Sequence, residues 1–154
     1  MNCAVAQSLE IIGEWWTLLI LRDAFLGVRR FDDFQARLGI ARNILSARLD
    51  TLVDAGVLER RLYDAARGRS DYVLTEKGRA LWPVLNAIRQ WGDDWVFGDG
   101  NEPLELLHTP CGCYTHAVQT CDECGEELRL EDVRSVPGPG LHDESFLPRY
   151  AATQ

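Results

Sequence analysis

The sequence predicts a mainly α fold with a small β-hairpin, followed by a small C-terminal module rich in cysteine. Three observations predict this. Leucines recur at three- and four-residue steps between residues 45 and 52, two short runs of β-branched and aromatic residues follow them, and four of the five cysteines lie between residues 111 and 124. With 154 residues, the chain can bury one good core and carry a satellite module. We expect a first domain at residues 1–98 and, at 99–154, a linker, the cysteine module (about 104–136) and a tail.

Two helices are expected before the leucine-rich segment. Residues 4–12 are a short helix candidate that ends at Gly13, and a second helix is expected from Trp15 to Phe25, with Trp15 and Leu21 among its core residues. No apolar run reaches the roughly 18 residues that span a bilayer. Neither a basic leader region nor an Ala-x-Ala-like cleavage site is visible at the start. We therefore expect a cytoplasmic protein with no membrane partner.

A second pair of helices, about a tight turn, is expected after Gly27. The later helix would run from Arg42 to Ala55, with Gly56 at its stop position. Its apolar side chains fall in one buried stripe, formed by Leu45, Leu49, Leu52 and Val53. The side chains that face outward are small: Asn43, Ser46, Ala47 and Asp50.

Two strands with a basic loop follow this helix. Val57 to Tyr63 and Asp71 to Leu74 are rich in β-branched and aromatic residues, and the loop between them holds Arg67, Gly68 and Arg69. A helix with small polar side chains beside a basic loop suits duplex DNA, because the helix reads base edges while the loop grips phosphates. This layout is a winged helix-turn-helix, with the wing at residues 63–70.

The residue types predict a division of the contacts with double-stranded DNA. Arginine suits guanine and asparagine suits adenine in the major groove, so the candidates for base edges are Arg42, Asn43 and Ser46. The candidates for phosphate contacts are Arg29, Arg30, Arg48, Arg67 and Arg69.

The charge distribution supports DNA binding although the whole chain is acidic. Between residues 29 and 69 there are nine arginines and six acidic residues, while the full chain has a formal net charge of −8. Residues 1–98 hold thirteen basic and thirteen acidic side chains, so the last 56 residues carry the entire net charge of −8. Acidic residues beside the cysteines would repel phosphates, and we do not expect that module to touch DNA.

A long helix is expected from Glu76 to about Phe97, with Thr75 as its N-cap and Gly98 at its end. Pro83 should kink this helix or mark a late start. Its apolar residues form an a/d seam: Leu81, Val84, Ile88, Trp91 and Trp95. The seam packs either against the core of its own domain or against a second copy of the chain. Its two tryptophans near the end favour an interface, and we expect a homodimer.

The cysteine module contains two copies of one ligand spacing. His108-x-x-Cys111-Gly112 and Cys121-x-x-Cys124-Gly125 each place two metal ligands before a glycine, as in a zinc knuckle. We expect one structural Zn2+ per chain in a closed, zinc-ribbon-like site with the ligands His108, Cys111, Cys121 and Cys124. Cys113 and His116 are competitors for the first pair. A redox dithiol at Cys121 and Cys124 is less favoured, because no βαβ unit precedes it.

A series of short motifs runs from residue 3 to residue 97. It comprises Cys3, Ile12-Gly13-Glu14-Trp15, Thr17 to Arg22, Arg30 to Phe34, Gly39-Ile40, Leu45 to Leu49, Gly56 to Leu58, Tyr72 to Gly78 and Trp91. Together these motifs resemble the HxlR-type branch of bacterial winged-helix transcription regulators. The resemblance implies a dimeric repressor or activator joined through its N-terminal and C-terminal helices. It also implies that the helix at 42–55 enters the major groove and that the wing lies at the minor groove.

The same resemblance draws attention to three further positions. Cys3 matches a position that is a redox- or electrophile-sensing thiol in some members of the family. Glu14 stands where the family often has lysine, and Asp71-Tyr72 lacks the proline that often precedes this part of the wing. These departures leave the fold intact and concern the contacts of the wing with DNA.

The leading hypothesis is a sequence-specific DNA-binding transcriptional regulator, expected to be a repressor, that reads a palindromic operator as a dimer. One alternative is a zinc-stabilised protein-interaction module. Another is a sensor that responds to thiol chemistry or to a small molecule in a pocket among Trp82, Trp91 and Trp95. An enzyme is least expected, because no nucleophile, base and orienting acid occur at a recognisable spacing.

Overall fold

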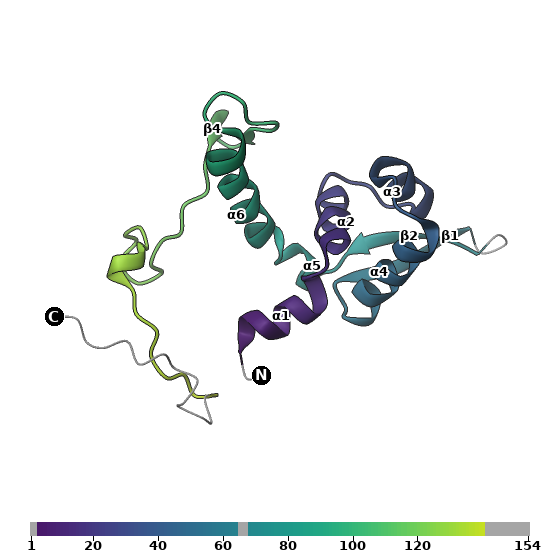
Figure 1. The fold of residues 1–154 in the computed structure, drawn as a ribbon, viewed down its shortest axis with the longest axis horizontal. Coiled ribbons are helices and arrows are strands. Elements are labelled where there is room, and N and C mark those ends of the chain that lie inside the picture. The colour runs from purple at the N-terminus through teal and green to yellow at the C-terminus, as the bar shows by residue number, and fades with distance from the viewer. Residues whose placement is uncertain (1–2, 65–67, 141–154) are drawn as a thin grey trace. The chain divides into compact units, whose positions relative to one another are not determined.

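The computed structural model describes residues 3–64 and 68–140, coloured along the chain in Figure 1. Contacts divide them into two compact units, the first at Cys3–Glu105 and the second starting at Leu106. The first unit thus extends through the expected linker. Arg67 of the expected wing lies outside the described residues.

The first two helices have the predicted bounds, α1 at Ala4–Ile12 and α2 at Trp15–Phe25. The prediction that Trp15 is a core residue is wrong, because its side chain is 70% exposed. A helix turns by about 100° per residue, which places Trp15 opposite the side that faces the core. The buried residues of α2 are Thr17, Ile20, Leu21 and Asp23. No single described helix is long and apolar enough to cross a membrane; α1 and α2 meet that criterion only as a pair, and the pair is bent by 77°.

Helices α3 (Phe31–Leu38) and α4 (Arg42–Asp54) form the predicted helix-turn-helix. Gly39 turns the chain between them at φ 64°, a left-handed conformation that glycine adopts readily because it has no Cβ. The predicted stripe on α4 is confirmed, since Leu45, Leu49 and Leu52 are fully buried and Val53 is partly buried. The helix ends at Asp54, one residue before the predicted end, and Ala55 is its C-cap.

The predicted hairpin is an antiparallel pair of strands, β1 (Leu58–Asp64) and β2 (Arg69–Leu74). The segment before α3 joins this sheet, because the backbone N–H of Tyr72 donates to the carbonyl of Arg29 at 2.7 Å. The start of the helix-turn-helix is therefore fixed to the second strand of the hairpin.

The core of the first unit draws on the two N-terminal helices, the helix-turn-helix and the start of the hairpin. Its buried apolar residues are Ile12, Ile20, Leu21, Phe34, Ile40, Leu45, Leu49, Leu52, Val57 and Leu58. Asp23 is also fully buried, and its carboxylate accepts hydrogen bonds from Arg22 Nε at 3.0 Å and Arg37 Nε at 3.1 Å. Since Arg37 belongs to α3, this carboxylate links α2 to the first helix of the helix-turn-helix.

The predicted single helix at the end of the first unit is interrupted. It consists of α5 (Glu76–Arg79), α6 (Trp82–Gly92) and a π-helical turn, η2 (Asp93–Phe97). Pro83 explains the break, because it has no N–H to donate and its ring clashes with the carbonyl four residues earlier. It lies in the first turn of α6, where a missing N–H costs nothing.

Thr75 caps α5, as predicted. Its hydroxyl accepts from the N–H of Gly78 at 3.0 Å and donates to the carbonyl of Gly56 at 2.7 Å. Gly78 packs so closely on the strand start that a Cβ there would lie 2.2 Å from the carbonyl oxygen of Val57. The cap and this close approach fix α5 against the end of the recognition helix and the start of the wing.

The second unit begins with a small antiparallel hairpin of β3 (Leu106–His108) and β4 (Cys113–Thr115). A second turn follows at residues 121–125, and a short 3-10 helix, η3, spans Leu130–Asp132. Each of the two turns contains one predicted pair of zinc ligands.

Candidate nucleic-acid interface

The first turns of α4 carry the side chains expected to meet base edges. Asn43 is exposed and Ser46 is half-buried. Helix-turn-helix proteins contact base edges through the N-terminal residues of their second helix. Asn43, the second residue of α4, therefore lies where such a contact is made.

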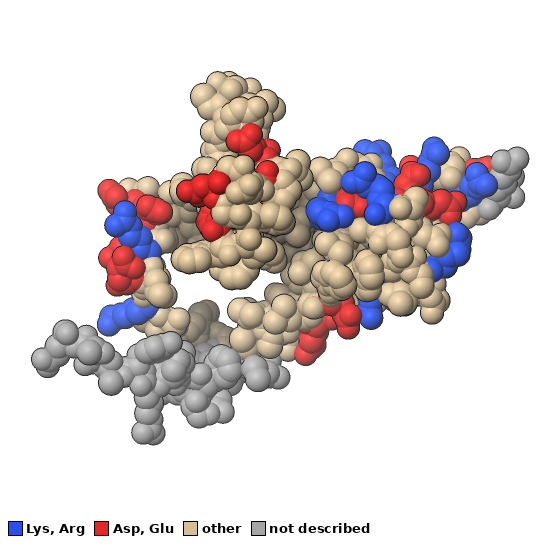
Figure 2. Space-filling model, turned by 45° about the horizontal axis from the view of Figure 1, so that its top comes forward, with Lys and Arg blue, Asp and Glu red and all other residues tan. Residues whose placement is uncertain are grey.

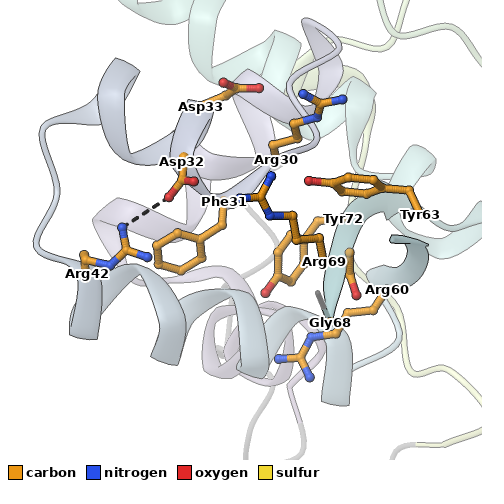
Figure 3. Close-up of a pocket in the computed structure, with 11 residues that line it drawn as sticks. Arg30, Phe31, Asp32, Asp33, Arg42, Arg60, Tyr63, Gly68, Arg69 and Tyr72 are labelled. Carbon is orange, nitrogen blue, oxygen red and sulfur yellow. Dashed lines mark hydrogen bonds and ion pairs between the residues drawn. The ribbon is translucent and has the colours of Figure 1, made fainter. Parts of the chain in front are cut away.

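Arg42 is held by neighbours within the protein. Its Nη1 donates to Gln35 Oε1 at 2.9 Å and to Asp32 Oδ1 at 3.2 Å, a contact drawn in Figure 3. Its guanidinium also lies over the ring of Phe31, 4.7 Å from the centroid. All three partners belong to α3, so Arg42 joins the two helices of the motif and is partly committed before any base is met.

Arg48 joins α4 to the N-cap residue of α2. Its Nη2 lies 3.4 Å from Glu14 Oε2, and 30% of its side chain is exposed. Its Nε is buried and makes no hydrogen bond to the described residues. A lysine at position 14 could not form this ion pair.

A pocket of about 540 Å³ lies between α3, the start of α4 and the wing (Figure 3). Its arginine and aromatic lining consists of Arg30, Arg42, Arg60, Arg69, Phe31, Tyr63 and Tyr72. The sequence indicated Arg30, Arg42 and Arg69 as DNA-binding residues. It did not name Arg60, Tyr63 or Tyr72 as DNA-binding residues.

Three pocket arginines lie over aromatic rings. The distances from guanidinium carbon to ring centroid are 4.7 Å for Arg42 and Phe31, 5.1 Å for Arg30 and Tyr63, and 5.7 Å for Arg60 and Tyr72. The face of a guanidinium is attracted to the ring, while its N–H groups point outward in the plane. These arginines are therefore oriented with donors still available.

Arg60 connects the wing to the recognition helix. Its Nη2 forms an ion pair with Asp50 Oδ1 of α4. Hydrogen bonding with Tyr72 raises the pKa of Arg60 above its usual value, opposed by slight desolvation and assisted by the charges of Asp50 and Asp54. The strand register pairs Arg60 with Tyr72, and a correct register would have revealed this contact from the sequence.

Basic side chains gather over the end of the first unit that carries α3 and the hairpin, with acidic side chains among them (Figure 2). Arg29 is exposed, and the side chain of Arg30 is 62% exposed. Arg69, the first residue of β2, lines the pocket. Three of the predicted phosphate contacts are therefore accessible.

The two predicted zinc-ligand turns are each closed by the same kind of backbone hydrogen bond. The N–H of Gly112 donates to the carbonyl of His108, and the N–H of Gly125 donates to the carbonyl of Cys121, both at 2.8 Å. Both glycines have positive φ, 69° and 77° respectively. Each turn therefore has the tight geometry that the glycine after the second ligand was expected to allow.

Side-chain contacts differ between these turns. In the first, His108 Nδ1 lies 3.1 Å from Cys111 Sγ. In the second, the backbone N–H groups of Cys124 and Glu123, followed by the Cys124 thiol, lower the pKa of the Cys121 thiol. The Cys113 thiol instead lies 3.6 Å from the Cys111 carbonyl.

The two pairs of predicted zinc ligands remain separate from each other in the described part of the chain. Among residues 3–64 and 68–140, no three His, Cys, Asp or Glu side chains are grouped closely enough to hold one metal ion. The donor types and the turn geometry fit zinc.

The helix-turn-helix with an exposed Asn43 and the arginine-bearing hairpin beside it define a winged-helix DNA-binding transcriptional regulator. A model of HxlR-like helix-turn-helix proteins matches residues 11–99, more than half of the chain. The chain belongs to this family. The expected fold class of its first unit and the expected regulatory function are thus confirmed.

Known regulators match different lengths of the chain. The uncharacterized HTH-type transcriptional regulator Rv3095 of Mycobacterium tuberculosis is 43% identical over 138 residues, which cover 90% of this chain and 87% of the relative. A match of that length in a chain of 154 residues includes residues 108–125, so it extends over both cysteine turns. The uncharacterized HTH-type regulator YvaP of Bacillus subtilis is 33% identical over 91 residues, 58% of this chain and 84% of the relative.

Solved structures likewise match either most of the chain or only its winged-helix part. PA1607, described as a candidate transcription factor, superposes with a TM-score of 0.79 at 41% identity and covers 89% of this chain and 96% of its own. The reduced form of the redox regulator HypR superposes with a TM-score of 0.55 at 28% identity and covers 58% of this chain and 90% of its own. Similarity over most of the chain is therefore shared with some relatives, and the winged helix with many.

Proposed function

We propose that the protein is a homodimeric repressor that binds a palindromic operator, with one recognition helix in each half-site. The observation that carries this proposal is the uncovered a/d seam on α6 and η2. Ile88 is 48% exposed, Trp91 62% and Trp95 76%. Leu81 at the start of the seam packs against the core of its own unit, whereas these three residues are left uncovered by it.

Both terminal helices offer apolar surface. On α1, Val5 is 68% exposed and Leu9 54%. Burying apolar surface contributes roughly 25 cal/mol per Å², and large aromatic residues dominate association energies. A second copy of the chain that covers these helices would agree with the dimer implied by the family.

A dimer explains how a small regulator selects its site. Two-fold symmetry places two recognition helices about one turn of DNA apart, which matches an inverted repeat. We favour repression, because a dimer bound over a promoter excludes polymerase by occupancy and needs no activating contact.

Light scattering on the full chain tests the dimer. The wild type is expected to have the mass of two chains, and Ile88→Asp that of one, with weaker binding to operator DNA. Leu26→Asp is a matched control, since Leu26 is 57% exposed but lies outside the seam, and this variant should remain dimeric. A monomeric wild type would contradict the proposal.

We also propose that the second unit holds one structural zinc ion through His108, Cys111, Cys121 and Cys124. The matching turns and the contact between His108 and Cys111 support this set. Bound zinc would supply folding free energy to a unit in which most described side chains are exposed. Four protein ligands would leave no coordination position for catalysis.

Metal analysis of purified protein tests the ligand set. One zinc per chain is expected in the wild type and in Cys113→Ala, and much less in Cys121→Ser and His108→Ala. Full zinc in His108→Ala together with loss in Cys113→Ala would assign the fourth ligand to Cys113. Absence of zinc from the wild type would remove the metal from the proposal.

A second candidate function is a response to thiol oxidation. It is favoured by the similarity to the redox regulator HypR and by the place of Cys3, half-buried at the N-cap of α1. Oxidant should then change the DNA affinity of the wild type but not of Cys3→Ser. Equal responses of the two proteins would exclude Cys3 as the sensor.

A further inference from the structure

We propose that the pocket between α3, the start of α4 and the wing binds phosphate groups of one DNA strand, with Arg60 and Tyr63 as additional contacts. This inference rests on the proposed function and deepens it, because it states how the winged-helix unit grips its DNA. Helix and wing would share one concave phosphate site, which we call the phosphate pocket, instead of contacting the backbone separately.

The phosphate pocket has a composition that suits a phosphodiester. Four arginines and two aspartates line it. Asp32 already pairs with Arg42. Arg30 and Arg60 have acidic partners of their own, Asp71 and Asp50. What the pocket offers a phosphate is therefore the N–H groups that these pairs leave available on its arginines, together with the hydroxyl group of Tyr63, which can donate to a phosphate oxygen.

Aromatic rings orient two of these arginines before DNA arrives. Arg30 lies over Tyr63, and Arg60 lies over Tyr72. A guanidinium held over a ring retains N–H groups that the ring does not use, and these can donate to phosphate oxygens. Less side-chain freedom is then lost when the backbone binds.

Both arginines keep donors available. The ion pair of Arg30 with Asp71 is long, at 4.0 Å, and the Arg30 side chain is 62% exposed. Arg60 pairs with Asp50 through Nη2 and is hydrogen-bonded to Tyr72, and a guanidinium with five N–H groups has further donors beyond these two contacts. A phosphate bound at Arg60 would draw the wing and, through Asp50, the recognition helix toward the same strand.

The position of the phosphate pocket favours the DNA backbone over a small anion. Its walls are the start of a helix expected in the major groove and a wing expected at the minor groove. The backbone that separates two neighbouring grooves must pass between such elements. Figure 3 shows Arg30, from the start of α3, and Tyr63 and Arg69, from the wing, around one space.

The test compares two neighbouring arginines of β1. Arg61 carries the same charge as Arg60 but does not line the pocket, and it pairs with Glu59 at 2.7 Å. Binding of the full chain to operator DNA is measured over a range of salt concentrations. Arg60→Gln should weaken binding to all sequences and reduce the slope of log K against log salt by about 0.9, the value for one phosphate contact. Arg61→Gln should leave the slope unchanged.

Two further variants separate a DNA contact from a structural role. Asp50→Asn removes the ion pair but leaves Arg60, so it should keep the wild-type slope. If Asp50→Asn reduced the slope as much as Arg60→Gln, Arg60 would act only by positioning the helix, and the proposal would be overturned. Arg30→Gln, at an exposed position that does not endanger folding, should reduce the slope by a similar amount.

Inorganic phosphate tests the alternative that the pocket binds a small anion instead of the DNA backbone. At constant ionic strength it should shift the melting temperatures of the wild type and Arg60→Gln equally. Selective stabilisation of the wild type, with unchanged DNA slopes in the variants, would overturn the assignment to DNA. If the wild type binds operator DNA and both Arg60→Gln and Arg30→Gln keep the wild-type slope of log K against log salt, the phosphate pocket is refuted but the proposed function stands. If the wild type shows no specific binding, the proposed function itself is refuted.

Discussion

Asp50 of the recognition helix and Arg60 of the wing form an ion pair that joins the two elements expected to hold DNA. Both side chains are about half exposed, at 46% and 47%. Solvent screening at such positions leaves little net stabilisation. The pair therefore sets the orientation of two elements more than it sets their stability.

A double-mutant cycle tests that distinction. For Asp50→Asn and Arg60→Gln, the coupling in the free energy of unfolding should stay below about 1 kcal/mol. Urea denaturation of the four proteins measures it. A coupling of several kcal/mol would show that the pair is a major stabilising contact.

The buried carboxylate of Asp23 should matter far more for stability. Asp23→Asn weakens two charge-assisted hydrogen bonds, to Arg22 and Arg37, and we expect a loss of about 1.5–3 kcal/mol in the free energy of unfolding. Asp32→Asn is the control, because Asp32 pairs with an arginine at an 81% exposed position and should cost less than about 1 kcal/mol. Equal losses in the two variants would contradict this view.

Replacing either of two glycines by alanine should change the free energy of unfolding, but in opposite directions. Gly78→Ala would place a Cβ 2.2 Å from a backbone oxygen, so α5 must shift, at a cost of about 1–3 kcal/mol. In Gly92→Ala the added Cβ has no neighbour within 4 Å, and position 92 lies in α6. This variant should therefore stabilise the folded protein by about 0.4–1 kcal/mol. Thermal unfolding monitored by circular dichroism gives both signs, and stabilisation by Gly78→Ala would contradict the packing described.

Base preference should depend on Asn43, and overall affinity on Arg69. Asn43→Ala is expected to relax discrimination at one base pair by about 1–3 kcal/mol. Arg69→Ala should weaken binding to all sequences alike, because phosphates carry no sequence information. Competition between operator and single-base variants measures both. An unchanged preference in Asn43→Ala would move the base contact elsewhere on α4.

Much of the fold followed from local patterns. The leucine spacing on α4 identified the recognition helix and its buried side, and the bounds of the first two helices were also correct. Pro83 was identified as a point of strain, yet whether it kinks or ends a helix depends on the turn in which it falls. Trp15 was misassigned because hydrophobicity alone does not say which side of α2 meets the core.

The site was harder to predict because its contacts join distant residues. Arg42 and Arg48 were both predicted as DNA contacts, but their pairing with Asp32 and Glu14 depends on tertiary structure. Arg60 was missed because its place in the pocket depends on strand register, and the ladder shifts near the wing tip, between Leu62 and Asp64. The spacing of the cysteines predicted two tight turns, but spacing cannot say whether the turns meet.

The most direct test of the regulator is selection of genomic DNA fragments bound by the full chain, followed by footprinting of the enriched sites. The account predicts an inverted repeat beside particular genes, with half-site centres about 10 base pairs, one helical turn, apart. Enrichment of single, unpaired half-sites, or no enrichment over random fragments, would contradict it.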